Sequence, residues 1–433
     1  MDYNEYLRNN LHFVTNNDGI LMFQIIVKVG SINETKGIQG YSHLLEHVKM
    51  NKGKSKAFDF SDGGVVNAYT SKDETVYYVK CNEKKLREAI DFCVDIVFNT
   101  SFKETKDLET EKKIVYEEMY MSKSRDMLYQ SLLDTILDDD SLYKNSVIGS
   151  KSDLKAATNK SLKEYNDYFY HVSNTKIVCS CGANKKRAAK TAILKSLQKY
   201  SAPIHAPTPR KLFNTHLDVC DFKRFDYSMI VHTVSHSTQN AIYLTFKTKD
   251  FYELNHIYLY FIHFVLSNNK ENSLLFEDIR EKKGAVYNIN STIDSYEHFS
   301  LYCIGFNTSS DNCIPIIKDI FQIMNDYLFS DRKMTKKKFN TYKENFVSQL
   351  HYQSSNNDSI FDFKKKVIHL KPKLNYKSYI KMIQDLTLER FIEICHESLN
   401  LNNLGCYIIS KSSSEKELTT AFKNILEKFK NEV

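Results

Sequence analysis

Residues 43–47 read H-L-L-E-H, and this pentapeptide decides how the rest of the chain is interpreted. Because His43 and His47 are four residues apart, they project from the same face of a helix, one turn apart. Glu46 lies beside His47 and one turn from His43, so its carboxylate can hold a water next to a metal bound by the histidines. H-x-x-E-H is a zinc-binding signature that carries its own general base. The alternative interpretation is a pair of solvated helix histidines.

A third metal ligand is expected downstream, because zinc in a hydrolytic site takes three protein ligands and leaves one position open for water. Residues 104–126 (ETKDLETEKKIVYEEMYMSKSRD) predict a charged helix with an apolar stripe formed by Leu108, Ile114, Val115 and Met119. Glu111 and Glu118 are two turns apart and share one face of this helix. Glu109 and Glu117 point elsewhere. We assign Glu118 to the metal and Glu111 to the orientation of a ligand histidine. The alternative is a solvated acidic helix face.

Two further segments extend these motifs into a pattern. Both segments follow H-L-L-E-H in the chain. The first, residues 63–79 (GGVVNAYTSKDETVYYV), precedes the E-x6-E formed by Glu111 and Glu118, and the second, residues 275–287 (LFEDIREKKGAVY), follows it. Together the four motifs resemble the insulinase/pitrilysin/mitochondrial-processing-peptidase family of zinc metallopeptidases, the inverzincins, in a short two-domain form. Residues 63–79 are similar to the family's N-A-x-T-S-x-x-x-T-x-Y-Y strand pair. Residues 275–287 are similar to its L-R-E-x-x-G-x-x-Y segment.

The resemblance implies an α+β fold of two homologous domains, each a mostly antiparallel sheet packed with helices, which together form half of a clamshell. It also implies that the strand around residues 66–70 lies near the motif helix and pairs with an extended substrate, with Asn67 and Ala68 as the contact residues. By the same resemblance, Arg280 and Tyr287 belong to a metal-free domain and take part in catalysis by stabilising the oxygen of the scissile carbonyl.

The two halves of the chain repeat one pattern of elements. In the first half, an apolar strand at residues 21–29 precedes the motif helix, paired strands over 63–81 and helices over 84–98 and 104–126. In the second half, a strand at 239–247 precedes helices over 252–281, paired strands near 285–306 and helices over 312–328 and 334–353. The second copy has no H-x-x-E-H. We therefore expect a duplicated α+β unit with one metal site.

The boundary between the halves is expected at a proline-rich stretch. Pro203, Pro207 and Pro209 all fall within residues 201–210 (SAPIHAPTPR), which is typical of a stiff linker. A chain of 433 residues suits two domains of about 200 residues each. We predict a zinc-binding catalytic domain over residues 1–205 and a metal-free domain over residues 206–433, which supplies Arg280 and Tyr287.

Composition and charge limit which kinds of partner and which cellular compartment are expected. A net charge of +7 is modest for this length, and lysine clusters such as Lys336–Lys338 lack interleaved aromatic residues, so no nucleic-acid partner is expected. The longest apolar run, residues 257–266, is too short to cross a bilayer. The nine cysteines are scattered, which indicates reduced thiols; Cys179 and Cys181 are expected in the core. No signal or transit peptide is recognised. We expect a cytoplasmic or other reducing intracellular location.

These observations predict a zinc metalloendopeptidase that cleaves peptides or unfolded segments. His43, His47 and Glu118 are expected to hold Zn²⁺, and Glu46 is expected to act as general base. The chain carries both the zinc set and the Arg280–Tyr287 pair, so we expect a homodimer whose sites are shared between subunits, or a heterodimer with a metal-free relative. The alternatives are a non-catalytic peptide-binding or scaffold subunit of the same fold, and a nucleic-acid-binding or structural protein with an accidental motif.

Overall fold

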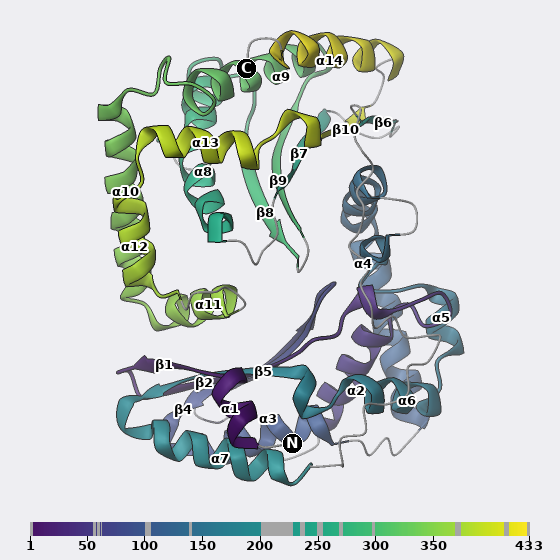
Figure 1. Cartoon of the computed structure of the whole chain (residues 1–433). Coiled ribbons are helices and arrows are strands. Elements are labelled where there is room, and N and C mark those ends of the chain that lie inside the picture. Colours follow the sequence, from purple (N-terminus) through teal and green to yellow (C-terminus); the bar gives the residue numbers. More distant parts are fainter. Residues whose placement is uncertain are drawn as a thin grey trace. The chain divides into compact units, whose positions relative to one another are not determined.

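Two five-stranded sheets, one in each of two α+β units, organise the chain (Figure 1). The structure is a computed structural model, and it describes residues 3–54, 58, 61, 63–99, 105–137, 141–200, 228–233, 239–248, 254–267, 272–296, 299–368, 374–410 and 415–430. Unit 1 comprises residues 1–134, 139–218 and 357–368, and unit 2 comprises residues 135–138, 219–356 and 369–433. Each unit therefore contains a short segment from the opposite half of the sequence.

Unit 1 is built on a sheet with the strand order β1-β5-β2-β4-β3. Its strands are β1 (Leu11–Asn16), β2 (Ile20–Val27), β3 (Val65–Thr70), β4 (Thr75–Asn82) and β5 (Thr175–Gly182). Strands β1 and β5 are parallel, and the other neighbours are antiparallel. The helices from this half are α1 (Tyr3–Asn10), α2 (Tyr41–Lys54), α3 (Leu86–Phe98), α4 (Thr105–Ile136), α5 (Lys151–Ala156), α6 (Asn159–Phe169) and α7 (Lys186–Gln198).

Unit 2 repeats this arrangement with the strand order β6-β10-β7-β9-β8. Its strands are β6 (Ser228–Thr233), β7 (Asn240–Thr248), β8 (Ile289–Ser295), β9 (Ser300–Thr308) and β10 (Leu404–Ser410). Again the first strand is parallel to the last, and the other neighbours are antiparallel. The helices from this half are α8 (Tyr258–Ser267), a π-helical segment (Phe276–Glu281), α9 (Cys313–Tyr327), α10 (Lys336–Ser354), α11 (Asn357–Val367), α12 (Tyr376–Gln384), α13 (Leu388–Ser398) and α14 (Glu415–Lys430).

The sheet of unit 1 is covered on both faces. Side chains alternate along β2, so that Phe23 and Ile25 enter the core formed with α2, α3 and α7, while Ile26 faces the other way. On that second face lies α11, whose Phe361 packs with Ile26, Val76 and other apolar strand residues. Lys80 and Asp358 form an ion pair at the border of this contact, with Nζ and Oδ1 2.7 Å apart. A helix from the second half of the sequence thus completes the first unit (Figure 1).

Unit 2 contains the end of α4, although most of this helix belongs to unit 1. Ile136, the last residue of α4, is buried and clusters with unit 2. A Cβ atom placed on Gly405 of β10 would lie 3.0 Å from Cγ2 of Ile136, tighter than ordinary van der Waals contact. Glycine at position 405 therefore lets the end of α4 approach the strand closely.

Two sheets with the same order and pairing sense confirm the predicted α+β duplication. The helices expected over residues 252–281 are α8, which ends at Ser267, and the π-helical segment, which begins at Phe276. The predicted linker at residues 201–210 and the boundary at 205/206 lie outside the described residues, so the domain boundary stays a prediction. Cys179 and Cys181 are fully buried, as predicted.

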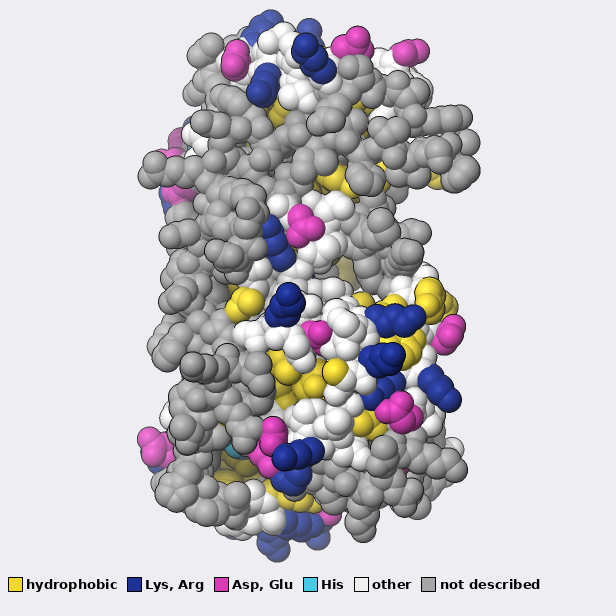
Figure 2. Space-filling model, turned by 90° about the vertical axis from the view of Figure 1, so that its right-hand side faces the viewer, with side chains coloured by type: hydrophobic (Ala, Val, Ile, Leu, Met, Phe, Trp, Pro, Cys, Tyr) yellow, Lys and Arg dark blue, Asp and Glu magenta, His cyan; other side chains and the backbone are white. Residues whose placement is uncertain are grey.

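Two surface properties bear on partners. Figure 2 shows one face of the molecule, and on its described part Lys and Arg side chains lie among acidic and hydrophobic ones. Among the described residues, no helix combines the length and the apolar character that a membrane span requires.

Candidate metal centre

Helix α2 presents the two histidines because its other side is buried. Leu44 and Leu45 are fully buried in the core of unit 1. Their burial fixes the rotation of the helix, which leaves His43 and His47 together on a neighbouring face. The rings of the two histidines have centroids 4.7 Å apart and meet edge to face.

Helix α4 supplies the acidic partners by the same logic. Leu108 and Val115, seven residues apart, are buried in the core, and they orient the face that carries Glu111 and Glu118. The predicted apolar stripe is wrong at Ile114, whose side chain is 42% exposed. Ile114 directly precedes Val115, so it is turned by about 100° around the helix and leaves the core.

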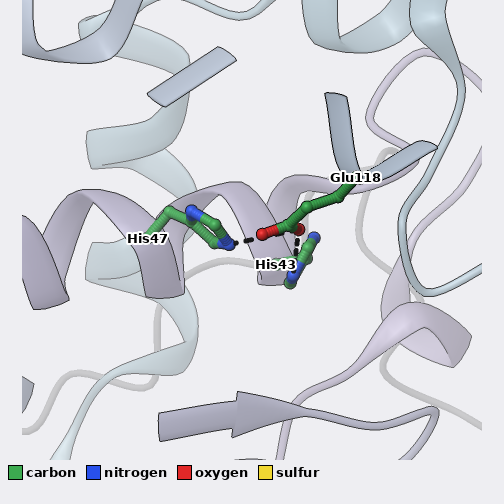
Figure 3. A group of neighbouring side chains, drawn as sticks. All are labelled: His43, His47 and Glu118. Carbon is green, nitrogen blue, oxygen red and sulfur yellow. Dashed lines mark ion pairs between the residues drawn. The ribbon is translucent and has the colours of Figure 1, made fainter. Parts of the chain in front are cut away.

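Three donor atoms converge between the two helices (Figure 3). The Nε2 atoms of His43 and His47 each lie 3.6 Å from Oε2 of Glu118. All three donor atoms lie within 4.8 Å of one another. A tetrahedral zinc ion with bonds near 2.1 Å needs ligand atoms roughly 3.4 Å apart, so the observed spacing fits this ion. Among the described residues, no second group of three such side chains converges in this way.

Burial acts on His43, and a hydrogen bond to Glu111 orients His47. Burial lowers the pKa of His43 to about 3, with a smaller contribution from neighbouring His47, so its imidazole stays neutral. The Nδ1 atom of His47 lies 3.2 Å from Oε2 of Glu111, which is almost fully buried. Since a carboxylate accepts hydrogen bonds, Nδ1 is the donor to Glu111, and Nε2 is the ring nitrogen directed toward Glu118.

Glu46 lies on α2 between the two histidines in sequence and is 7% exposed. Burial raises the pKa of its carboxyl group, and a hydrogen bond from Thr70 Oγ1 to Oε2, 3.2 Å long, acts in the opposite direction. A carboxylate in such a setting has a raised proton affinity, which suits a group that takes a proton from water. Thr70 was not singled out by the sequence, although it lies within the N-A-x-T match.

Strand β3 carries Thr70 and also the two predicted substrate contacts. It stands last in the strand order of its sheet, with β4 as its neighbour. The side chains of Val66 and Ala68 pack against the core, and Asn67 is exposed. The Asn67 side chain accepts a hydrogen bond from the backbone N–H of Ala68. Since β3 packs against α2, its edge runs next to the helix that bears the histidines.

The structure brings Arg280 and Tyr287 together in unit 2. The guanidinium carbon of Arg280 lies 5.9 Å from the centre of the Tyr287 ring and 4.4 Å from that of Phe276. Tyr287 is 86% exposed. The turn between them contains Gly284 with φ +59°, a left-handed conformation that glycine adopts without strain. Phe276, which sequence reasoning did not select, therefore forms a platform for the arginine.

Comparisons with known proteins agree with this architecture. The sequence model of the family described as "Insulinase (Peptidase family M16)" matches residues 15–149, and the one described as "Peptidase M16 inactive domain" matches residues 156–346. The first match contains the convergent histidines and Glu118. The second contains Arg280 and Tyr287.

Several individual relatives are named as proteases or as peptidase subunits. The chain is 29% identical over 297 residues to an uncharacterized zinc protease of Bacillus subtilis, YmxG, covering 66% of this chain and 68% of that protein. It is 27% identical over 207 residues to the mitochondrial-processing peptidase subunit beta of Caenorhabditis elegans, covering 45% and 43%. A solved protease from Helicobacter pylori shares the fold with a TM-score of 0.76 at 17% identity, covering 93% of this chain and 98% of that one.

Proposed function

The chain belongs to peptidase family M16, and from that premise we propose that it is a zinc-dependent endopeptidase acting on peptides or unfolded polypeptide segments. The observation that carries the proposal is the convergence of His43 Nε2, His47 Nε2 and Glu118 Oε2, with Glu46 on the same helix. The homologues named zinc proteases support the peptidase class and the metal.

In the proposed mechanism, His43, His47 and Glu118 would hold Zn²⁺. When bound there, the ion would lower the pKa of a water molecule and polarise the scissile carbonyl. Glu46 takes the proton of that water and passes it to the leaving amine. Glu111 keeps His47 in the tautomer that leaves Nε2 free. The chain thus provides the base and the orientation of the ligands.

Substrate binding is proposed along the edge of β3. An extended peptide can pair with the backbone of an edge strand, and Asn67 and Ala68 would be its contacts. Pairing through the backbone reads chain conformation more than side chains. Peptides and unfolded segments therefore fit this site better than folded proteins.

We further propose a homodimer in which zinc from one subunit works with Arg280 and Tyr287 from the other. The Arg280 guanidinium lies over the Tyr287 ring, and both residues fall within residues 156–346, which match the model described as "Peptidase M16 inactive domain". A guanidinium and a phenol together offer donors for an oxygen that gains negative charge. A heterodimer with a metal-free relative is the alternative assembly.

The proposed compartment is cytoplasmic or otherwise reducing. The eight cysteines in the described part of the chain are free thiols, and all are buried. Free thiols without disulfide partners are typical of proteins from reducing compartments.

The first experiment is cleavage of a mixed peptide library, read by mass spectrometry. Wild-type protein is compared with Glu46→Gln and with wild type treated with a chelator. Cleavage that disappears in both controls supports the proposal. Zinc bound at one per chain without cleavage, in both homodimer and monomer preparations, would contradict it and favour the non-catalytic peptide-binding alternative.

The shared site has its own test. Glu46→Gln chains are mixed with Tyr287→Phe chains after dissociation. In a randomly mixed dimer population, half of the dimers contain both chains and each of these has one intact site. Recovery of about a quarter of wild-type activity is expected. No recovery from a demonstrably mixed dimer would refute the shared site.

A further inference from the structure

Glu34 is a fully buried carboxylate at the start of the helix that carries the histidines. Its Oε2 atom accepts a hydrogen bond from the backbone N–H of Gly40, and its Oε1 atom accepts one from the N–H of Ser42, both 2.6 Å long. Helix α2 begins at Tyr41, so the amide of Gly40 directly precedes the helix and the amide of Ser42 lies in its first turn. Such amides have no partner within the helix.

Burial raises the pKa of Glu34 to about 7, so an ionised carboxylate makes this contact at pH values above this. Each oxygen of Glu34 is used as an acceptor, and a negative charge at a helix N-terminus interacts favourably with the helix dipole. An amide in the same place would accept one hydrogen bond and turn an N–H₂ group toward the second N–H donor. Glutamate at position 34 is therefore matched to the two amides in a way that glutamine is not.

The segment that bears Glu34 is itself fixed by neighbouring elements of unit 1. The Nδ2 atom of Asn145 donates to the carbonyl oxygens of Ser31 and Glu34, at 3.1 and 2.6 Å. The carbonyl oxygen of Asn145 accepts a hydrogen bond from Nζ of Lys72, 2.8 Å long. Lys72 lies in the turn between β3 and β4, and its own carbonyl oxygen accepts from the N–H of Ile32. The loop before α2 is thus tied to the hairpin that bears the predicted substrate strand.

A close backbone contact holds the end of this loop. Gly40, with φ +93°, approaches Gly149, with φ +81°. A Cβ atom on Gly149 would lie 2.3 Å from Cα of Gly40, so neither position has room for a side chain. The first turn of α2 therefore has a fixed starting point, and His43 follows three residues after Gly40.

We propose that Glu34 is a positioning residue of the metal centre: by binding both amides at the start of α2 it fixes the register and direction in which His43 and His47 reach the metal. This inference rests on the proposed function, because it concerns the same zinc site. Glu34 touches neither metal nor substrate, and acts through the helix.

Zinc affinity measures this role without relying on turnover. Metal-free wild type, Glu34→Gln and Asp153→Asn are titrated with zinc in competition with a chromogenic chelator. Asp153 is the matched control, because one of its oxygens, Oδ2, accepts the hydrogen bonds from the backbone N–H groups of Gly37 and Gln39, while Oδ1 accepts one from Oγ of Ser152. An asparagine oxygen can replace Oδ2, so this variant removes a carboxylate charge that contacts the same loop from helix α5, while keeping the acceptor.

We expect the zinc dissociation constant of Glu34→Gln to rise about tenfold and that of Asp153→Asn to stay near wild type. At saturating zinc, kcat of Glu34→Gln should fall about tenfold while KM is unchanged, since the substrate strand is intact. If Glu34→Gln does not fold, Glu34→Asp keeps the charge but shortens the reach by one methylene, and zinc binding should weaken in the same direction.

Equal zinc affinity of Glu34→Gln and wild type would overturn the inference while leaving the proposed function in place. An equal loss in Asp153→Asn would also overturn it, because loop charge rather than the amide contact would then be responsible. Wild-type protein that binds no zinc would overturn both the proposed function and the inference.

Discussion

Phe361 of α11 tests whether a helix from the second half of the chain belongs to the first folding unit. Its side chain is 4% exposed and packs with Val14, Ile26, Val76 and Val178. Replacing a buried phenylalanine with alanine costs about 3–5 kcal/mol. The cluster is small and α11 can settle partly into the space, so we expect the low end, about 3 kcal/mol, for Phe361→Ala. The loss should fall on unit 1.

The matched control is Phe346→Ala, fifteen residues earlier in the chain. Phe346 is 3% exposed, and its ring lies 5.1 Å from that of Phe264 in unit 2. Hydrogen exchange followed by mass spectrometry distinguishes the units, because local openings have their own free energies. Phe361→Ala should speed exchange in β2 and β5, and Phe346→Ala in β7 and β9. Faster exchange in β7 and β9 of Phe361→Ala, with β2 and β5 unchanged, would refute the assignment of α11.

Three further predictions concern the metal centre and the base beside it. Glu111→Ala should weaken zinc binding by about 10- to 100-fold in a chelator titration, because His47 loses its orienting acceptor. Burial raises the pKa of Glu34 to about 7, so the native state holds a proton that the unfolded state releases. The unfolding free energy of wild type should therefore drop relative to Glu34→Gln, by about 3 kcal/mol as pH rises from roughly 4.5 to 7, in urea titrations; a difference independent of pH would contradict this. Thr70→Val removes a hydrogen bond that lowers the pKa of Glu46, so the acid limb of kcat/KM should move to higher pH.

The pattern of apolar residues along the sequence was enough to predict several strands and helices that bury one face. The apolar strand predicted at residues 21–29 is β2, and the paired strands predicted over residues 63–81 are β3 and β4. Such patterns report which face of a strand or helix is apolar, within one element. They do not report which distant element covers that face. Helix α11 shows this limit: nothing in residues 357–367 indicates that the apolar side chains of this helix pack on a sheet formed more than 170 residues earlier.

The candidate site likewise contains residues that the sequence could identify and residues that only the folded structure reveals. The sequence was enough to select the histidines and Glu118, because helical geometry relates residues on one helix. His43 and His47 are four residues apart on α2, and Glu118 is seven residues from Glu111 on α4. Thr70 and Glu34 act through contacts between separate elements, a strand with a helix and a loop with a helix terminus. Their residue types are ordinary, and only the folded arrangement shows that Glu34 is buried with two amides as partners.

Divergence of the two units explains why one carries the metal ligands. In unit 2, α8 holds His263, whose Nδ1 lies 2.7 Å from Oγ of Ser291, a hydroxyl that also accepts from Tyr302. That histidine is engaged in a buried polar network, and α8 carries no acidic residue. Tyr287, by contrast, is 86% exposed, although a large aromatic side chain gains most from burial. The guanidinium carbon of Arg280 lies 5.9 Å from the centre of its ring. An exposed phenol beside a guanidinium leaves both groups accessible, which is the arrangement that the proposed shared site requires.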